Sequence, residues 1–167
     1  MKSALVACLV FAALVAPAVA QNAGEIARTR AGANCPHCNL FQADLGGLTL
    51  KGRNYSGARL RQADLSLGIF NHTRFTHADL RDINAYGALF TGADLSGADL
   101  THASFVGAYL EGASLRGART QGTDFSGAQM QRARGLTQSQ LDGACGDRST
   151  RLPYGLHLAP CRGGRPD

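Results

Sequence analysis

Large apolar residues recur at every fifth position along most of this chain, with small and polar residues between them in a fixed order. Nineteen quintets follow one another in phase from Cys38 to Arg132. When the large residue is numbered i, Leu, Phe or Met fills that centre sixteen times, Ala occupies i−2 twelve times and Gly occupies i+2 eleven times. A period this short and this regular predicts a repeat architecture.

The five-residue period fits neither an ordinary helix nor an ordinary strand. A helix, with about 3.6 residues per turn, would spread the large residues around its circumference. A strand would point successive centres to opposite faces. A chain that turns a corner after each quintet satisfies the pattern, with i−2 and i in the interior and Gly at the corner. Four sides make a coil of about twenty residues, and successive coils stack about 4.8 Å apart.

Typical quintets also carry a family resemblance. A-D-L-S-G at 93–97, A-D-L-T-H at 98–102 and A-S-L-R-G at 113–117 resemble the A-(D/N)-L-x-x consensus of the pentapeptide-repeat family. The resemblance spans 95 of the 167 residues. It implies an all-β solenoid, a right-handed quadrilateral β-helix of nineteen pentapeptide repeats. The rod would have about 4.75 coils and a length of about 23 Å.

Departures from the consensus predict local differences. Ile83 is large for an Ala position, but Ala85 fills the centre of the same quintet, so we interpret the pair as a swap that conserves interior volume. In the first coil Leu48, Arg53 and Tyr55 break the pattern. An inward Arg53 would be costly unless it is paired or turned outward. We therefore expect the first coil to be distorted.

The segment before the repeats predicts export and a cap. Residues 1–20 have the parts of a signal peptide, with Lys2, an apolar run over 5–15 and the small residues Ala18 and Ala20 before the cleavage point. We predict an exported protein, periplasmic or secreted, without a membrane span. Residues 21–37 are expected to cap the N-terminal end of the rod, because stacked repeats need capped ends.

Residues 133–167 predict the opposite cap. Thr137 and Gln140 form a T-x-x-Q capping box, and Leu136 and Leu141 flank it at the positions of a hydrophobic staple. A short helix is therefore expected over 138–144. Residues 149–167 lack periodicity and are expected to form an extended tail, closed by a disulfide.

Four cysteines follow the predicted signal peptide. A rod would separate Cys35 and Cys38 from Cys145 and Cys161 by some 20 Å, well beyond the Cα separation of about 7 Å that a disulfide allows. We therefore predict two local bonds, Cys35–Cys38 and Cys145–Cys161. The run Cys35-Pro36-His37-Cys38 also matches the active site of the periplasmic dithiol oxidases of the thioredoxin superfamily. Such a motif needs a following helix to lower the thiol pKa, and here a pentapeptide strand follows.

Charge and histidine placement favour no catalytic, cofactor or metal site. After residue 20, 16 Lys and Arg face 12 Asp and Glu, and the repeats hold 9 basic and 8 acidic residues. Nucleic-acid binders cluster basic residues on one face, so we interpret the excess as a solubility feature and predict no nucleic-acid partner. Histidines 72, 77 and 102 occupy i+2 corners on three different sides and are expected to be isolated. Charges at 59, 79, 99 and 119 stack as a solvated face.

One outward surface stands out as a candidate interaction site, which we name the apolar stripe. Positions twenty residues apart stack on one side, so six apolar residues are expected to lie together across the middle coils. They are Leu67, Ile69, Tyr86, Leu89, Val106 and Tyr109. Contiguous apolar surface usually marks a contact. Either the tail from Leu152 to Leu158 covers the stripe, or a protein partner or a second copy does, or the grouping is chance.

The sequence favours a non-enzymatic, exported pentapeptide-repeat protein that acts as a rigid binding or structural module. Two alternatives come from other classes. The first is a thiol–disulfide redox protein that uses the motif from Cys35 to Cys38. The second, implied by the resemblance, is a DNA-mimicking, gyrase-interacting protein. That class acts in the cytosol with an acidic surface, whereas this chain has an export signal and a balanced repeat region.

Overall fold

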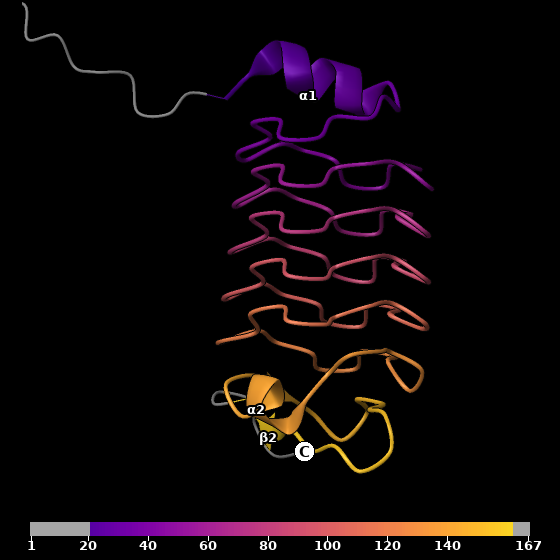
Figure 1. Ribbon diagram of the computed structural model, residues 1–167, viewed down its shortest axis with the longest axis vertical. Coiled ribbons are helices and arrows are strands. Elements are labelled where there is room, and N and C mark those ends of the chain that lie inside the picture. The colour runs from indigo at the N-terminus through magenta and orange to yellow at the C-terminus, as the bar shows by residue number, and fades with distance from the viewer. Residues whose placement is uncertain (1–20, 162–167) are drawn as a thin grey trace, which may run out of the picture.

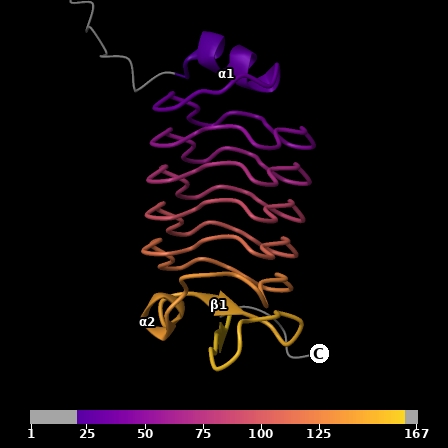
Figure 2. The ribbon, with the colours of Figure 1, turned by 45° about the vertical axis from the view of Figure 1, so that its right-hand side comes forward.

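The computed structural model describes residues 21–161, which form a four-sided rod with a helix at each end (Figure 1). Parallel bridges join outward i−1 residues of successive coils, twenty residues apart within the repeats, in four columns. The first column contains residues 39, 59, 79, 99 and 119, and the second 44, 64, 84, 104, 124 and 145. The third contains residues 49, 69, 89, 109, 129 and 151, and the fourth 54, 74, 94, 114 and 134. Figure 2 shows the coils stacked along one axis.

The corners between the sides are tight turns that the i+2 residue makes possible. In the first complete quintet the N–H of Ala43 donates to the carbonyl of Leu40 at 3.0 Å, and Gln42 between them has φ of 53°. Every i+2 residue from Gln42 to Gly127 has a positive φ. A type II turn requires this conformation at its third residue, and Gly adopts it without strain. The Gly at i+2 therefore follows from the geometry of the corner.

The interior is filled by the i and i−2 side chains that the sequence predicts. The largest buried side chains include an aromatic series along the rod, in which neighbouring ring centroids lie 5.2–5.9 Å apart. Ile83 and Ala85 are both buried. A similar compensation occurs in the quintet centred on Phe70: Gly68 takes the place of Ala at i−2, and an added Cβ there would overlap the ring of Phe70. Interior volume is therefore balanced within single quintets.

The first coil is regular, so the predicted distortion is wrong. The N–H of Ile69 donates to Leu48 and that of Arg74 donates to Arg53, each at 2.8 Å, as in later coils. Arg53 is exposed, and its guanidinium turns outward toward Gly32. Because Arg53 leaves the interior, it carries no desolvation penalty and the backbone ladder continues.

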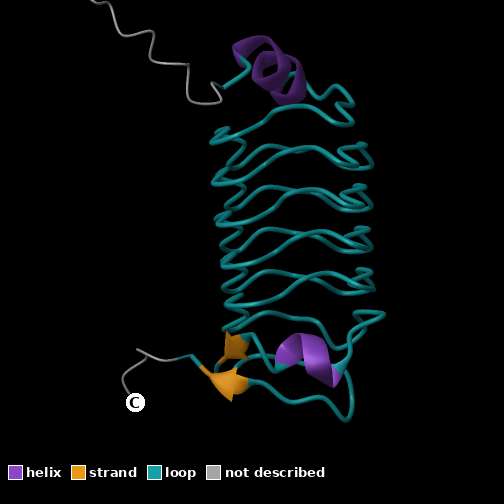
Figure 3. Ribbon diagram, turned by 60° about the vertical axis from the view of Figure 1, so that its left-hand side comes forward, coloured by secondary structure: helices purple, strands orange, loops and turns teal. Residues whose placement is uncertain are grey.

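The N-terminal cap is the helix α1 (Ala23–Arg30), which lies across the open end of the first coil (Figure 3). Asn22 caps its first turn by accepting from the N–H of Glu25. The carboxylate of Glu25 accepts from the N–H of Asn39 at 2.6 Å, and Arg30 donates to the carbonyl of Asp44 at 2.8 Å. Side chains of α1 thus satisfy backbone groups that a preceding coil would otherwise pair.

The C-terminal cap begins with α2 (Gln138–Leu141), and the capping box with Thr137 is present. Leu141 is fully buried. The predicted helix over 138–144 is too long, because the chain after Leu141 returns to the ladder. The N–H of Gly122 donates to the carbonyl of Gly143, and Cys145 bridges to Asp124.

The predicted extended tail instead forms a last, irregular turn of the rod. Strand β1 (Cys145–Gly146) pairs in parallel with β2 (Ala159–Pro160). Leucines 152, 156 and 158 are partly buried against the core. The tail rejoins the rod because its leucines cover the apolar end of the last coil. Within residues 21–161 no helix is long and apolar enough to cross a membrane. The predicted signal peptide, 1–20, lies outside the described residues.

Candidate interaction surface

The apolar stripe lies where the sequence places it, on the third column and the corner before it. Ile69, Leu89 and Tyr109 bridge in succession along that column. Tyr86 is 55% exposed and Tyr109 is 48% exposed. Ile69, Leu89 and Val106 have intermediate exposure, as outward residues packed between neighbouring coils do. The six side chains therefore form one open surface over three successive coils.

Leu67 is the most exposed member of the stripe and is the one large apolar residue among the positive-φ corners from 42 to 127. It is 63% exposed and has φ of 56°. The equivalent corner in the other coils is Gly, at positions 47, 87, 107 and 127. The Leu67 side chain lies over Gly87, where an added Cβ would meet Leu67 Cδ2 at 2.9 Å. A left-handed conformation and an exposed apolar side chain are both unfavourable, so the folded rod gains nothing obvious from this leucine.

The tail does not cover the stripe within the described residues, so that alternative is wrong. Arg151 bridges to Gln129, one coil below Tyr109, and the chain then passes beneath the last coil. His157 is held there by Gln138 of α2. A partner, a second copy or chance remain as explanations of the stripe.

The N-terminal cysteines form a corner of the rod. Cys35 and Cys38 are disulfide-bonded, with Cα atoms 5.4 Å apart, and both are buried. The N–H of Cys35 donates to Asn54 and that of His37 to Ser56, so residues 33–37 behave as one more quintet before the predicted start. His37 takes the positive φ of an i+2 residue. Sequence reasoning treated the run as a separate motif, although Ala33 and His37 fit the repeat register.

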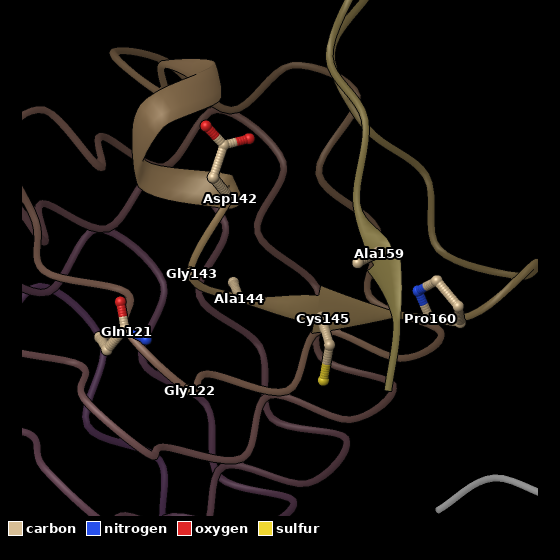
Figure 4. A pocket seen from close by; sticks show the side chains of 8 residues that line it. All are labelled: Gln121, Gly122, Asp142, Gly143, Ala144, Cys145, Ala159 and Pro160. Carbon is tan, nitrogen blue, oxygen red and sulfur yellow. The ribbon is translucent and has the colours of Figure 1, made fainter. Parts of the chain in front are cut away.

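The C-terminal cysteines, Cys145 and Cys161, are also joined, with Cα atoms 4.8 Å apart. Cys145 lines a hollow of about 430 Å³ between α2, the last regular coil and the two short strands (Figure 4). Its polar lining side chains are Gln121 and Asp142. Asp124 approaches the two sulfur atoms, but disulfide sulfurs are not thiolate ligands for a metal.

The histidines at the corners lie over glycines of the next coil. His72 covers Gly92, and His77 covers Gly97. His102 covers Gly122 and lies 3.8 Å from a carboxylate oxygen of Asp82. The three rings lie on three different corners, as expected, so they form no cluster.

In the charged first column, the side chain of Arg81 pairs with both Asp79 and Asp99. Arg59, Asp79, Asp99 and Arg119 bridge in order, as the sequence predicts. Arg81 donates two 2.7 Å hydrogen bonds to Asp79. This pairing lowers the pKa of the Asp79 carboxyl below its ordinary value, mainly through the Arg81 hydrogen bond. The column presents a neutralised, hydrogen-bonded face rather than an acidic surface.

The four-sided rod of stacked quintets makes this protein a β-solenoid, and comparison with known families shows to which family it belongs. The family model for pentapeptide repeats matches with 8 copies, over residues 38–82, 69–105, 78–117 and 108–145. The chain belongs to the pentapeptide-repeat family. No curated protein matches it.

Solved structures of the same family resemble this chain. A pentapeptide repeat protein from the thylakoid lumen of Arabidopsis thaliana is 29% identical, with a TM-score of 0.52, over 59% of this chain and 65% of that one. HetL, a pentapeptide repeat protein involved in heterocyst differentiation regulation in Nostoc, is 33% identical, with a TM-score of 0.48, over 80% of this chain and 57% of that one. This chain thus spans less than two thirds of each. QnrB1, a plasmid-mediated fluoroquinolone resistance protein, is 22% identical with a TM-score of 0.33 over 65% of each chain.

Proposed function

We propose that this protein is a non-enzymatic, exported rod that holds a protein partner or a second copy on its apolar stripe. The observation that carries the proposal is Leu67, which is exposed and has a positive φ in a column where other coils have Gly. Such a residue is unfavourable for the isolated rod. Its neighbours Tyr86 and Tyr109 are exposed aromatics, the residue type that contributes most to protein interfaces.

The rod itself supports a binding role through rigidity. Every coil is joined to the next by backbone hydrogen bonds of about 2.7–3.1 Å, so the stripe side chains are held in a fixed array. A preorganised surface loses little conformational entropy on binding. Export is supported by the signal peptide that the sequence predicts at 1–20 and by the thylakoid-lumen location of one relative.

The two alternative functions have less support. Cys35 and Cys38 are buried at a turn, 3% and 7% exposed, whereas a redox motif presents an accessible sulfur at a helix N-terminus. Free-thiol titration of the native protein in mild reductant separates the two readings, because a buried structural bond should stay closed. A DNA-mimicking role needs an acidic surface, whereas the repeats hold 9 basic and 8 acidic residues, and among the described columns only the second carries carboxylates without arginine.

The proposal is tested by placing a charge in the middle of the stripe. Leu89→Asp should abolish association, measured by sedimentation of the pure protein and by recovery of co-purified envelope proteins. Ser114→Asp is the matched control, since it adds the same charge at the same register on the fourth column. If the wild type is monomeric and captures nothing that Leu89→Asp loses, the stripe is not a binding surface.

A further inference from the structure

The outward columns end in arginine on three of the four sides of the rod. Arg119 is the last residue of the first column, Arg151 of the third and Arg134 of the fourth. The second column continues instead into β1 and β2. All three arginines are exposed. At the opposite end the columns begin with residues 39, 44, 49 and 54, none of them basic.

Three more arginines lie in the last regular coil and the cap, and we name the six together the arginine collar. Its members are Arg116, Arg119, Arg132, Arg134, Arg148 and Arg151. Arg119 and Arg132 each face one carboxylate, at 3.8 and 3.9 Å, and their side chains stay 74% and 87% exposed. Within residues 21–161 the other four have no carboxylate oxygen within 4 Å of a guanidinium nitrogen. The collar charges are therefore largely free to meet an external anion.

The collar concentrates the basic excess of the chain. Residues 112–161 contain six Arg against Asp124, Asp142 and Asp147, a net charge of +3, whereas residues 22–111 contain eight basic and eight acidic residues. The carboxylate of Asp147 accepts hydrogen bonds from Gly127 and from the loop at 149–150. The repeats are nearly balanced in charge, as their sequence shows, and the excess lies at the C-terminal end of the folded rod.

An exposed aromatic residue projects from the same end. Tyr154 lies in a turn in which the N–H of Leu156 donates to Pro153, and Gly155 has φ of 82°. The turn leaves the Tyr154 side chain wholly exposed, at 106% of its reference area, while Leu152 and Leu156 pack against the core. Tyrosine in such a position is suited to the boundary between water and lipid.

We propose that the rod docks by its C-terminal end against an anionic lipid surface, with the arginine collar on the headgroups and Tyr154 at the interface. Arg119, Arg134 and Arg151 lie on three different sides of the rod, so an extended polyanion along one side would reach only part of the collar. A flat surface met end-on reaches all three sides. Guanidinium groups bind phosphate in two-point contacts. Basic residues near an anionic leaflet add to binding one by one.

The test is vesicle flotation of the protein purified from exported material. Vesicles containing phosphatidylglycerol should bind it, and vesicles of phosphatidylcholine alone should not. Binding through the apolar residues 5–15 would occur on both kinds of vesicle, so the difference between them measures the contribution of lipid charge. A variant with Arg119, Arg134 and Arg151 changed to Gln should lose about 100-fold in affinity, at about fivefold for each arginine. Tyr154→Ser should weaken binding further. The stripe variant Leu89→Asp should bind vesicles as the wild type does. The vesicle experiment therefore tests the collar separately from the proposed function of the stripe.

A matched control separates the collar from net charge. Changing Lys51, Arg53 and Arg74 to Gln removes from the opposite half of the rod three exposed charges that have no ion-pair partner among residues 21–161. This triple variant should keep vesicle affinity within about twofold, because charges farther than the Debye length of about 10 Å are screened. Equal losses in both triple variants would overturn the proposal. So would the absence of vesicle binding together with collar-dependent binding of soluble polyglutamate, which would assign the collar to an acidic protein.

Discussion

The imidazole of His77 lies over Gly97 of the next coil, so that an added Cβ at Gly97 would stand 2.5 Å from His77 Nδ1. The corner at Gly117 has the same φ, within a degree, but nothing lies within 4 Å of an added Cβ. Glycine is therefore required at Gly97 both by its positive φ and by the overlying His77 ring, and at Gly117 by its positive φ alone. The pair allows backbone strain to be measured separately from packing.

Gly117→Ala should lower the free energy of unfolding by about 1–2 kcal/mol, the strain of a left-handed residue. Gly97→Ala should lower it by about 1–3 kcal/mol more, because the ring of His77 must move. Chemical denaturation measures both. In a His77→Gly background the difference between the two alanine variants should disappear. If it persists, the histidine ring does not occupy the space over Gly97.

Leu67→Gly should not destabilise the rod, although it deletes a large apolar side chain. The leucine is 63% exposed and has φ of 56°, so its removal relieves strain of about 1–2 kcal/mol and loses little burial. Because Gly also gives up more entropy on folding, we expect a net gain of about 0–1 kcal/mol by urea denaturation. Leu67→Asn, which tolerates the conformation, is the control. A loss above about 1 kcal/mol would mean that Leu67 serves the fold rather than binding.

The N-terminal cap depends on the hydrogen bond from Asn39 N–H to Glu25. Glu25→Ala should cost about 1–3 kcal/mol, since an acceptor for a part-buried backbone donor is removed. Glu25→Gln keeps an acceptor oxygen and should cost about half as much. Thermal unfolding of the two variants measures the difference. Equal effects would show that charge, rather than the accepting oxygen, matters at this end.

Acid should weaken the C-terminal cap through Asp147. Hydrogen bonds, first of all from Ser149, lower the pKa of its carboxyl from 3.8 to about 2. A lowered folded-state pKa stabilises the protein above the unfolded value, and this contribution is lost as pH falls from about 4 toward 2. The stability difference between wild type and Asp147→Asn should therefore shrink over that range in denaturation curves. If the stability difference did not change with pH, the ionisation of Asp147 would not contribute to the stability of the cap.

The repeat core could be predicted from sequence because one physical rule fixes it. Each corner needs a residue that tolerates positive φ, and each side needs a small and a large interior residue, so the pattern at Ala43 and Leu45 recurs. The ends obey no such rule. Helix α1 was missed because its contacts are single side chains, Glu25 and Arg30, on backbone groups of the first coil.

The stripe was predictable and the arginine collar was not. Ile69, Leu89 and Tyr109 are twenty residues apart, so the period alone stacks them. The collar joins Arg119 and Arg134, inside or next to the repeats, to Arg151, which lies 22 residues after Gln129. That spacing depends on how the cap rejoins the ladder, which the sequence pattern does not state.

The central claim, that the stripe is a contact surface, is tested most directly by photo-crosslinking in cells that export the protein. A photoreactive phenylalanine analogue is placed at Leu89, in the middle of the stripe, or at Ser114, in the same register on the fourth column. We predict a discrete adduct, with a partner or with a second copy, from position 89 and none from position 114. No adduct from position 89, or the same adducts from both positions, would contradict the account.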